Sequence, residues 1–143
     1  MRPVAEALIK MASHIPIYFF GTPFEHAAGE VAALREGECL ILESTRRELG
    51  EDTNDSAFIQ LLASLADVFV GDAFAEAHRD YASNVGVAKL LPRYMGILMR
   101  EEVEHLDAAR TPEHPSFAIL GGAKFETKAP LINELLNTYD RLL

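Results

Sequence analysis

Blocks of apolar residues alternate with polar stretches along the chain, and their spacing predicts helices and strands in alternation. Bounded apolar runs predict buried strands at residues 15–20, 39–42, 68–70 and 117–120. Apolar residues that recur every three or four positions predict helices at about residues 3–13, 25–35, 55–65, 93–109 and 126–139. This alternation is typical of an α/β fold with a mostly parallel sheet and flanking helices.

Turn and cap residues mark where several of these elements begin and end. Gly37 follows the second helix, where a left-handed cap is expected. The polar stretch from Glu43 is predicted to be loop until Asn54 or Asp55 caps the next helix. Pro130 favours a kink at the start of the last helix.

A proline-rich stretch divides the chain into two parts. Residues 111–115 contain two prolines, and they predict a linker between an α/β domain at 1–110 and a strand-helix unit at 116–143. A single strand-helix pair cannot bury its own apolar faces, because it needs neighbouring strands. The sequence therefore predicts a fold that is incomplete at its carboxyl end.

Composition and charge narrow the class of protein. The 143 residues are 49% hydrophobic and 24% charged, which is typical of one soluble globular domain. Thirteen basic and 22 acidic residues give a net charge of −9, which argues against a nucleic-acid partner or an anionic membrane. Glu6 and Lys10 interrupt the first apolar residues too soon for a signal peptide or a membrane span. Cys39, the single cysteine, is predicted to be a buried thiol and fits the reducing cytoplasm.

Basic side chains follow three of the predicted strands. They are Arg46 with Arg47, His78 with Arg79, and Lys124 with Lys128. The carboxyl ends of parallel strands lie at one edge of a sheet, so Arg46 and Arg79 are expected to face one crevice and bind a phosphate or carboxylate. On these residues alone, the alternative that both are ordinary surface arginines of an acidic protein carries the greater weight.

A glycine pair follows the last predicted strand. Gly121 and Gly122 precede Ala123 and Lys124, but the spacing is neither GxxxxGK[ST] nor GxGxxG, and such a pair more often forms a turn. Glycines nevertheless let a ligand approach the backbone, and Lys124 and Lys128 share one helical face, which suits a polyphosphate. No His or Cys spacing predicts a metal site, and no GxSxG motif predicts a nucleophile.

Six stretches of the sequence together resemble phosphoglycerate kinase. They are PVAEAL, GECLILESTR, NDSAFIQLLASLADVFV, GDAFAEAHRDYAS, MGILMREEVEHL and FAILGGAKFETK. Their order and spacing are similar to those in the middle third of that family, and the similarity covers essentially all 143 residues. The AHR run at 77–79 and the GGAK run at 121–124 are separate motifs on either side of the predicted linker, which makes the resemblance specific.

The resemblance implies part of a Rossmann-like kinase of two α/β domains. Residues 1–110 would belong to the amino-terminal, 3-phosphoglycerate-binding domain, 111–115 to a hinge, and 116–143 to the first strand-helix unit of the nucleotide-binding domain. The implied reaction is reversible phosphoryl transfer in glycolysis between 1,3-bisphosphoglycerate and ADP, giving 3-phosphoglycerate and ATP. Magnesium would be carried by the nucleotide, as Mg-ATP or Mg-ADP. The full-length form is expected to be a cytoplasmic monomer, and the isolated chain is expected to be prone to self-association.

The same resemblance assigns site residues by motif. Substrate binding falls to Arg46, Arg79 and His78. Nucleotide binding falls to Gly121, Gly122, Ala123, Lys124 and Lys128, of which the two lysines would be catalytic, and no residue is assigned to a metal.

The chain departs from the family pattern, and it lacks parts of it. Gly71 stands where the family usually has Asn, Ala75 where it often has Gly, and Tyr81 where the second His of AHRAH would be. The opening DFNVP and SHLGRP runs and the adenine pocket have no counterpart. We therefore expect a fragment with weak or no turnover. The alternative is a non-catalytic anion-binding or interaction module whose last strand pairs with a partner or a second copy.

Overall fold

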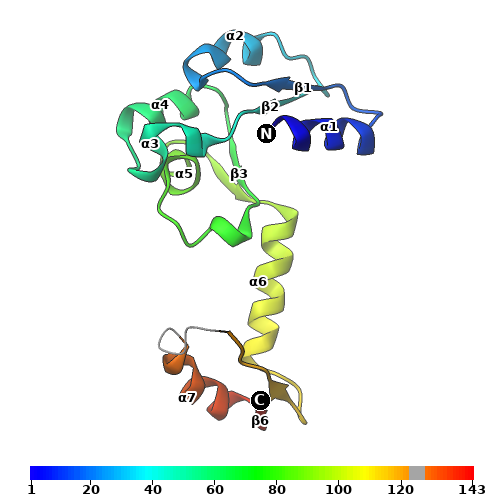
Figure 1. Ribbon diagram of the computed structural model, residues 1–143, viewed down its shortest axis with the longest axis vertical. Coiled ribbons are helices and arrows are strands. Elements are labelled where there is room, and N and C mark those ends of the chain that lie inside the picture. The colour runs from blue at the N-terminus through cyan, green and yellow to red at the C-terminus, as the bar shows by residue number, and fades with distance from the viewer. Residues whose placement is uncertain (123–127) are drawn as a thin grey trace. The chain divides into compact units, whose positions relative to one another are not determined.

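The computed structural model of the chain describes residues 1–122 and 128–143. These residues form two compact units, Met1–Gly96 and Ile97–Leu143 (Figure 1). The domain boundaries predicted at residues 110 and 116 stay a prediction.

The first unit contains strands that alternate with helical segments. In chain order they are α1 (Arg2–Met11), β1 (Ile17–Phe20), η1 (Phe24–His26), α2 (Ala27–Ala32), β2 (Cys39–Leu42), η2 (Thr45–Arg47), α3 (Leu49–Asp52), α4 (Ser56–Ala63), β3 (Phe69–Gly71), η3 (Phe74–Glu76), η4 (Ala82–Gly86), α5 (Val87–Leu90) and β4 (Arg93–Met95). The segment η4 is a π-helix, and the other η segments are 3₁₀ turns.

The strands of the first unit form two parallel pairs. β1 lies beside β2 with Ile17 opposite Cys39, and β3 lies beside β4 with Phe69 opposite Arg93. A helix returns the chain within each pair, α2 in the first and α5 in the second, as parallel pairing requires. The predicted α/β class with parallel strands is therefore confirmed.

Asp55 sets the start of α4 and the position of its aromatic residue. The Asp55 carboxylate accepts hydrogen bonds from the backbone N–H groups of Ala57 and Phe58, each at 3.0 Å, which confirms the predicted cap. The Phe58 ring then meets Phe24 edge to face, with 5.6 Å between ring centroids. Ala82 completes this buried cluster, so α4 packs against η4, and Figure 1 shows α3, α4 and α5 side by side.

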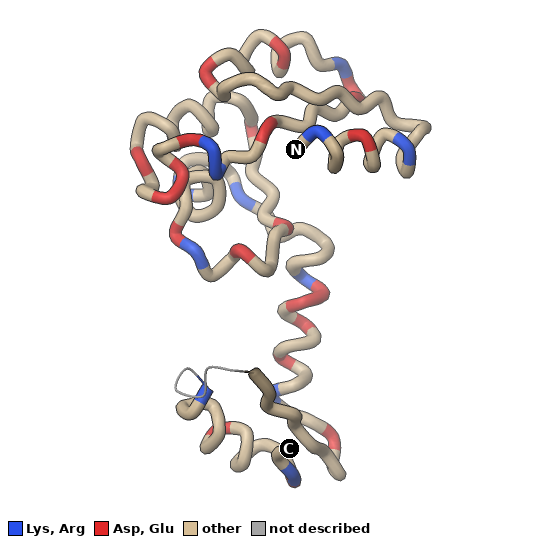
Figure 2. Tube along the Cα trace, viewed as in Figure 1, with Lys and Arg blue, Asp and Glu red and all other residues tan. Residues whose placement is uncertain are grey.

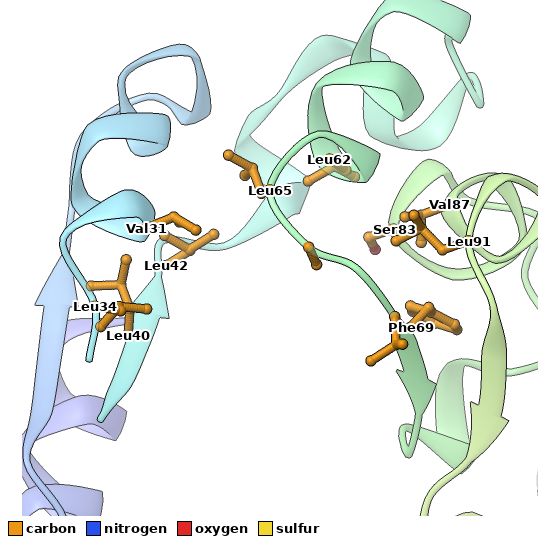
Figure 3. Close-up of a pocket in the computed structure, with 12 residues that line it drawn as sticks. Val31, Leu34, Leu40, Leu42, Leu62, Leu65, Phe69, Ser83, Val87 and Leu91 are labelled. Carbon is orange, nitrogen blue, oxygen red and sulfur yellow. The ribbon is translucent and has the colours of Figure 1, made fainter. Parts of the chain in front are cut away.

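An apolar cavity of about 330 Å³ lies between the two strand pairs. Leu40 and Leu42 of β2 line one side, and Leu62, Phe69 and Leu91 line the other (Figure 3). Apolar side chains stabilise a fold by about 25 cal/mol for each Å² of their surface that is removed from water. The side chains that face this cavity are not fully packed, so they contribute only part of that stabilisation. The core of the first unit is therefore open between its two strand pairs.

The second unit contains two helices and one strand pair among its described residues. They are α6 (Ile97–Arg110), β5 (Phe117–Ala118), α7 (Ala129–Thr138) and β6 (Arg141–Leu142). β5 and β6 are parallel, with Phe117 opposite Arg141. Figure 2 shows several acidic residues along α6.

A cluster at Asp140 ties the segment before β5 to the segment before β6. Its Oδ2 atom accepts the backbone N–H of Ser116 at 2.7 Å and lies 2.8 Å from Nδ1 of His114. The Asp140 carboxylate thus has both His114 and Ser116 as neighbours. They lower the pKa of Asp140, with His114 as the larger cause.

The structure corrects two predictions in the first unit. Residues 49–52, predicted as loop, form α3, because Glu51 within this turn is buried by contacts from elsewhere in the chain. Residues 93–95, predicted to open a helix, form β4, because main-chain pairing with β3 outweighs the helical period there. α6 therefore begins only at Ile97, while η4 and α5 have no counterpart among the predicted elements.

Other differences are local. β6 was not predicted, and because it pairs with β5 the expectation that the last strand lacks a neighbour in this chain is wrong. Cys39 is exposed rather than buried, since it is the first residue of β2. Gly37 has the predicted left-handed φ of 81°, but in the turn before β2 instead of directly after α2. Pro130 lies in the first turn of α7, where a missing N–H breaks no helical hydrogen bond.

Candidate anion-binding site

The loop after β2 carries the first candidate arginine. Arg46 lies in η2, and its side chain is about half exposed. Its Nη1 atom lies 2.8 Å from Oδ1 of Asp52 in α3. Arg47 instead lies 3.4 Å from Oε2 of Glu43. The two adjacent arginines are therefore directed to different carboxylates.

The loop after β3 carries the second candidate arginine. Nε of Arg79 lies 3.0 Å from Oε2 of Glu76 in η3. The side-chain amide of Asn84 donates to the carbonyl oxygens of Glu76 and Arg79, at 2.9 and 3.1 Å, and so fixes the loop backbone against η4. His78 is exposed in the same loop.

Tyr81 joins the two arginines. Cζ of Arg46 lies 4.3 Å from the centroid of the Tyr81 ring, and Cζ of Arg79 lies 5.7 Å from it. Nη1 of Arg79 also donates a hydrogen bond to the Tyr81 hydroxyl at 2.9 Å. Tyr81 is the first cause of a raised pKa at Arg46, and the charge of Asp52 adds to it. The fold thus brings two arginines from separate loops to one aromatic side chain.

A buried carboxyl group holds the two arginine-bearing loops together. Glu51 of α3 is only 2% exposed. It accepts hydrogen bonds from the backbone N–H of Ser83 at 3.0 Å, from the Ser83 hydroxyl at 2.5 Å and from the Thr45 hydroxyl at 3.1 Å. Because Thr45 precedes Arg46 and Ser83 closely follows Tyr81, a single side chain fixes the distance between the loops.

Asn54 forms a second link between the same regions. Its Nδ2 atom donates to Oδ1 of Asp80 at 2.7 Å, directly before Tyr81 in the chain. The backbone of Asn54 has a φ of 55°, a left-handed conformation that Asn adopts more readily than most residues. This conformation turns the chain from α3 into α4 and aims the amide at the second loop.

Taken together, these contacts create a small cationic surface. Two guanidiniums present N–H donors in the planar arrangement that suits phosphate and carboxylate oxygens. Each guanidinium already has one carboxylate neighbour, Asp52 for Arg46 and Glu76 for Arg79, at hydrogen-bond distance. An incoming anion must therefore share these arginines with two carboxylates, which favours a ligand of more than one negative charge.

The glycine pair and one of its lysines lie in the second unit. Gly122 has a φ of 125°, which only glycine adopts readily. The Lys128 ammonium donates a hydrogen bond to the carbonyl oxygen of Gly121, so the lysine folds back over the pair. Ala123 and Lys124 lie outside the described residues. Their role, and that of the other three, stays a prediction.

The described residues also bear on metal sites and membrane-spanning helices. Within residues 1–122 and 128–143, no three His, Cys, Asp or Glu side chains are grouped so that they could hold a metal ion. No helix in the same ranges is long and apolar enough to cross a membrane.

Sequence reasoning missed the residues that organise the site. Glu51 stands in a run of polar residues, and nothing local separates it from exposed neighbours such as Asp52. Tyr81 was visible only as a departure from the family pattern. The one available signal was the polar Asn54-Asp55 pair before a helix, which marks a tight turn but does not show what Asn54 contacts.

The comparisons with known proteins agree with one another. A family model described as phosphoglycerate kinase matches residues 1–143. A phosphoglycerate kinase of Thermus thermophilus is 47% identical over 148 residues, covering 100% of this chain and 37% of the relative. A phosphoglycerate kinase of Caulobacter vibrioides is 45% identical over 141 residues, covering 97% of this chain and 35% of the relative.

Solved structures give the same result. The phosphoglycerate kinase of Pyrococcus horikoshii matches with a TM-score of 0.85 at 30% identity, over 99% of this chain and 37% of that chain. The phosphoglycerate kinase of Coxiella burnetii matches with a TM-score of 0.76 at 34% identity, over 98% of this chain and 34% of that chain. The chain therefore spans about a third of the length of the relatives it matches.

Proposed function

Because this chain belongs to the phosphoglycerate kinase family, we propose that it acts as part of a longer kinase. The proposed reaction is reversible phosphoryl transfer between 1,3-bisphosphoglycerate and ADP, giving 3-phosphoglycerate and ATP in glycolysis. Two observations support a role within a longer polypeptide. The chain covers 35–37% of its bacterial relatives, and the cavity between its strand pairs leaves apolar side chains that further strands would cover.

We assign the 3-phosphoglycerate side of the reaction to the loops after β2 and β3. The observation that carries this assignment is the meeting of Arg46 and Arg79 at Tyr81. A phosphorylated carboxylic acid has enough negative charge to compete with Asp52 and Glu76 for the guanidiniums. His78, exposed in the second loop, would add a hydrogen-bond donor to the same ligand.

The nucleotide side is assigned to the start of the second unit. Gly121, Gly122 and Ala123 would leave the backbone open to the phosphates, and Lys124 and Lys128 would neutralise them. Magnesium enters as part of the nucleotide substrate, so no residue of this chain is assigned to hold it. In this proposal Lys128 must exchange its hydrogen bond to Gly121 for one to a phosphate oxygen.

The proposed mechanism needs no covalent intermediate on the protein. The arginines would hold the glycerate end in place, and Lys124 and Lys128 would balance the charge of the phosphoryl group as it moves. Catalysis would then rest on alignment and charge neutralisation. Since much of each half-site belongs to the rest of the polypeptide, the isolated chain should bind a ligand better than it turns one over.

We further propose that the full-length protein is a cytoplasmic monomer with small-molecule partners. Support comes from the net charge of −9, which disfavours nucleic acid and anionic membranes as partners.

Isothermal titration of the purified 143-residue chain with 3-phosphoglycerate tests the proposal. We expect weak, saturable heat that disappears when Arg46 and Arg79 are both replaced by Ala. Absence of heat with the unmodified chain would contradict the assigned site. Turnover of 1,3-bisphosphoglycerate and ADP should stay near background. The reason is that the loss of several residues that align the substrates lowers the rate of reaction by many powers of ten. Robust turnover would show that the rest of the polypeptide is not needed.

A further inference from the structure

Tyr81 makes side-chain contacts with both arginines through different parts of the same residue. Cζ of Arg46 lies over the Tyr81 ring, 4.3 Å from the ring centroid, within the range of a cation–π contact. Its hydroxyl accepts the 2.9 Å hydrogen bond from Nη1 of Arg79. The ring therefore lies closest to Arg46 and also within 5.7 Å of Arg79, whereas the hydroxyl is hydrogen-bonded to Arg79.

This arrangement opposes the repulsion between two positive charges. Two guanidiniums brought to one place repel each other, and each also has a carboxylate at hydrogen-bond distance, Asp52 for Arg46 and Glu76 for Arg79. The negative face of an aromatic ring and a phenol oxygen both attract cations at low conformational cost. The Tyr81 side chain contacts both guanidiniums and so favours their closeness.

The backbone of Tyr81 has a separate role, which allows the side chain to be tested by itself. Its carbonyl oxygen accepts hydrogen bonds from the N–H groups of Asn84, Val85 and Gly86 in η4. Substitution of the side chain leaves these bonds available. A structural effect through η4 and a positioning effect through the arginines can therefore be separated.

We propose that Tyr81 is a positioning residue of the anion-binding site, whose ring orients Arg46 and whose hydroxyl orients Arg79 toward one bound phosphate or carboxylate. The inference rests on the proposed function, since it concerns the same site. It assigns a role to a position where this chain departs from the AHRAH pattern.

The test compares two substitutions in the 143-residue chain, Tyr81→Phe and Tyr81→Leu. Phe keeps the ring and removes the hydroxyl, so we expect about threefold weaker binding of 3-phosphoglycerate. Leu removes both, and we expect about tenfold weaker binding. Tyr94→Leu is the matched control, because Tyr94 is exposed on β4 of the same unit, and its replacement should leave the dissociation constant unchanged.

A second readout reports the arginines directly. In ¹⁵N-arginine NMR spectra, the ring current of Tyr81 should shift the side-chain signals of Arg46, and this shift should persist in Tyr81→Phe and vanish in Tyr81→Leu. The Arg79 guanidinium signal should change in both variants. A side chain that only stabilised η4 would not produce this split between ring and hydroxyl.

The outcomes separate the inference from the proposed function. If the unmodified chain does not bind 3-phosphoglycerate, the proposed site fails and the positioning role fails with it. If the chain binds, Arg79→Ala weakens binding and Tyr81→Leu changes neither affinity nor the Arg46 signals, the site stands and the role of Tyr81 is overturned. Loss of affinity in the expected order, with the split in the NMR signals, supports both.

Discussion

Glu51 accepts a hydrogen bond from the backbone N–H of Ser83 at 3.0 Å, although 31 residues separate them along the chain. The same side chain also accepts from the hydroxyls of Ser83 and Thr45. It lies in α3, and its hydrogen bonds join the segments next to the two arginine-bearing loops. The distance between the two arginine-bearing loops thus depends on one buried carboxyl group. The hydrogen bonds described for this group go to Ser83 and Thr45, and none of them goes to an arginine.

Replacing Glu51 by Ala should destabilise the first unit. The substitution leaves the Ser83 N–H without its buried acceptor, and we expect a loss of about 2–3 kcal/mol in the free energy of unfolding. Urea denaturation, together with amide hydrogen exchange at Ser83, measures it. Glu36→Ala is the control, since Glu36 is exposed and should change stability by less than about 0.5 kcal/mol. Unchanged exchange at Ser83 would show that the bond is not formed in solution.

Arg79→Ala should weaken binding of 3-phosphoglycerate by about 1.5–3 kcal/mol, the usual contribution of a hydrogen bond between charged groups. Isothermal titration gives the number. Arg100→Ala is the matched control, because Arg100 also forms an exposed ion pair, with Glu104 on α6, but belongs to the other unit. An unchanged titration curve for Arg79→Ala would remove this arginine from the site.

Asp52→Asn should strengthen binding of the same ligand by about two- to fivefold. Asp52 lies 2.8 Å from Arg46, so its negative charge competes with an incoming phosphate. The gain should shrink as salt is raised, because the competing charges are solvent-exposed. Titrations at low and high ionic strength measure it, with Glu104→Gln as the control. Weaker binding by Asp52→Asn would mean that the carboxylate orients Arg46 more than it competes with the ligand.

Two glycines should respond to Ala with opposite signs. A Cβ atom at Gly86 would lie 2.6 Å from Cγ1 of Ile59, so Gly86→Ala should overpack the contact between η4 and α4 and destabilise by about 1–3 kcal/mol. A Cβ at Gly29, in α2, meets nothing within 4 Å, and Gly29→Ala should stabilise by about 0.5–1 kcal/mol. Urea midpoints of the two variants measure both effects, and equal midpoints would refute the packing of η4 on α4.

Asp140→Asn should destabilise the second unit relative to the unmodified chain, and this loss of stability should be larger at neutral pH than at low pH. The contacts of His114 and Ser116 lower the pKa of Asp140. A carboxyl group with a lowered folded-state pKa contributes stability that is present above its unfolded pKa and is lost as the pH falls through the folded value. The difference between the two proteins should therefore shrink below about pH 3.9.

Hydrogen exchange of the Ser116 amide between about pH 7 and pH 2.5 follows that difference, once the intrinsic pH dependence of exchange is removed. Asp107→Asn is the control, because Asp107 is an exposed carboxylate on α6. A difference that persists undiminished at low pH would show that the charge of Asp140 contributes nothing to this cluster.

Local sequence patterns predicted those helices and strands whose formation depends mainly on residues close to them in the sequence. The strands at 17–20 and 39–42 follow from short bounded apolar runs, and α4 follows from its cap at Asp55. The α/β class follows from the alternation of these elements. The placement of Arg46 and Arg79 in the loops that follow two strands was predictable for the same reason.

The tertiary structure decided which segments that are distant in the sequence pair or form hydrogen bonds with one another. β4 and β6 form because β3 and β5 offer parallel partners, which outweighs the local preference of two or three residues. Glu51 is buried because Ser83 and Thr45 supply its hydrogen bonds, and Tyr81 meets both arginines because that carboxyl group sets the loop spacing. Periodicity and caps encode contacts within a few residues, whereas these contacts depend on which segments meet after the chain has folded.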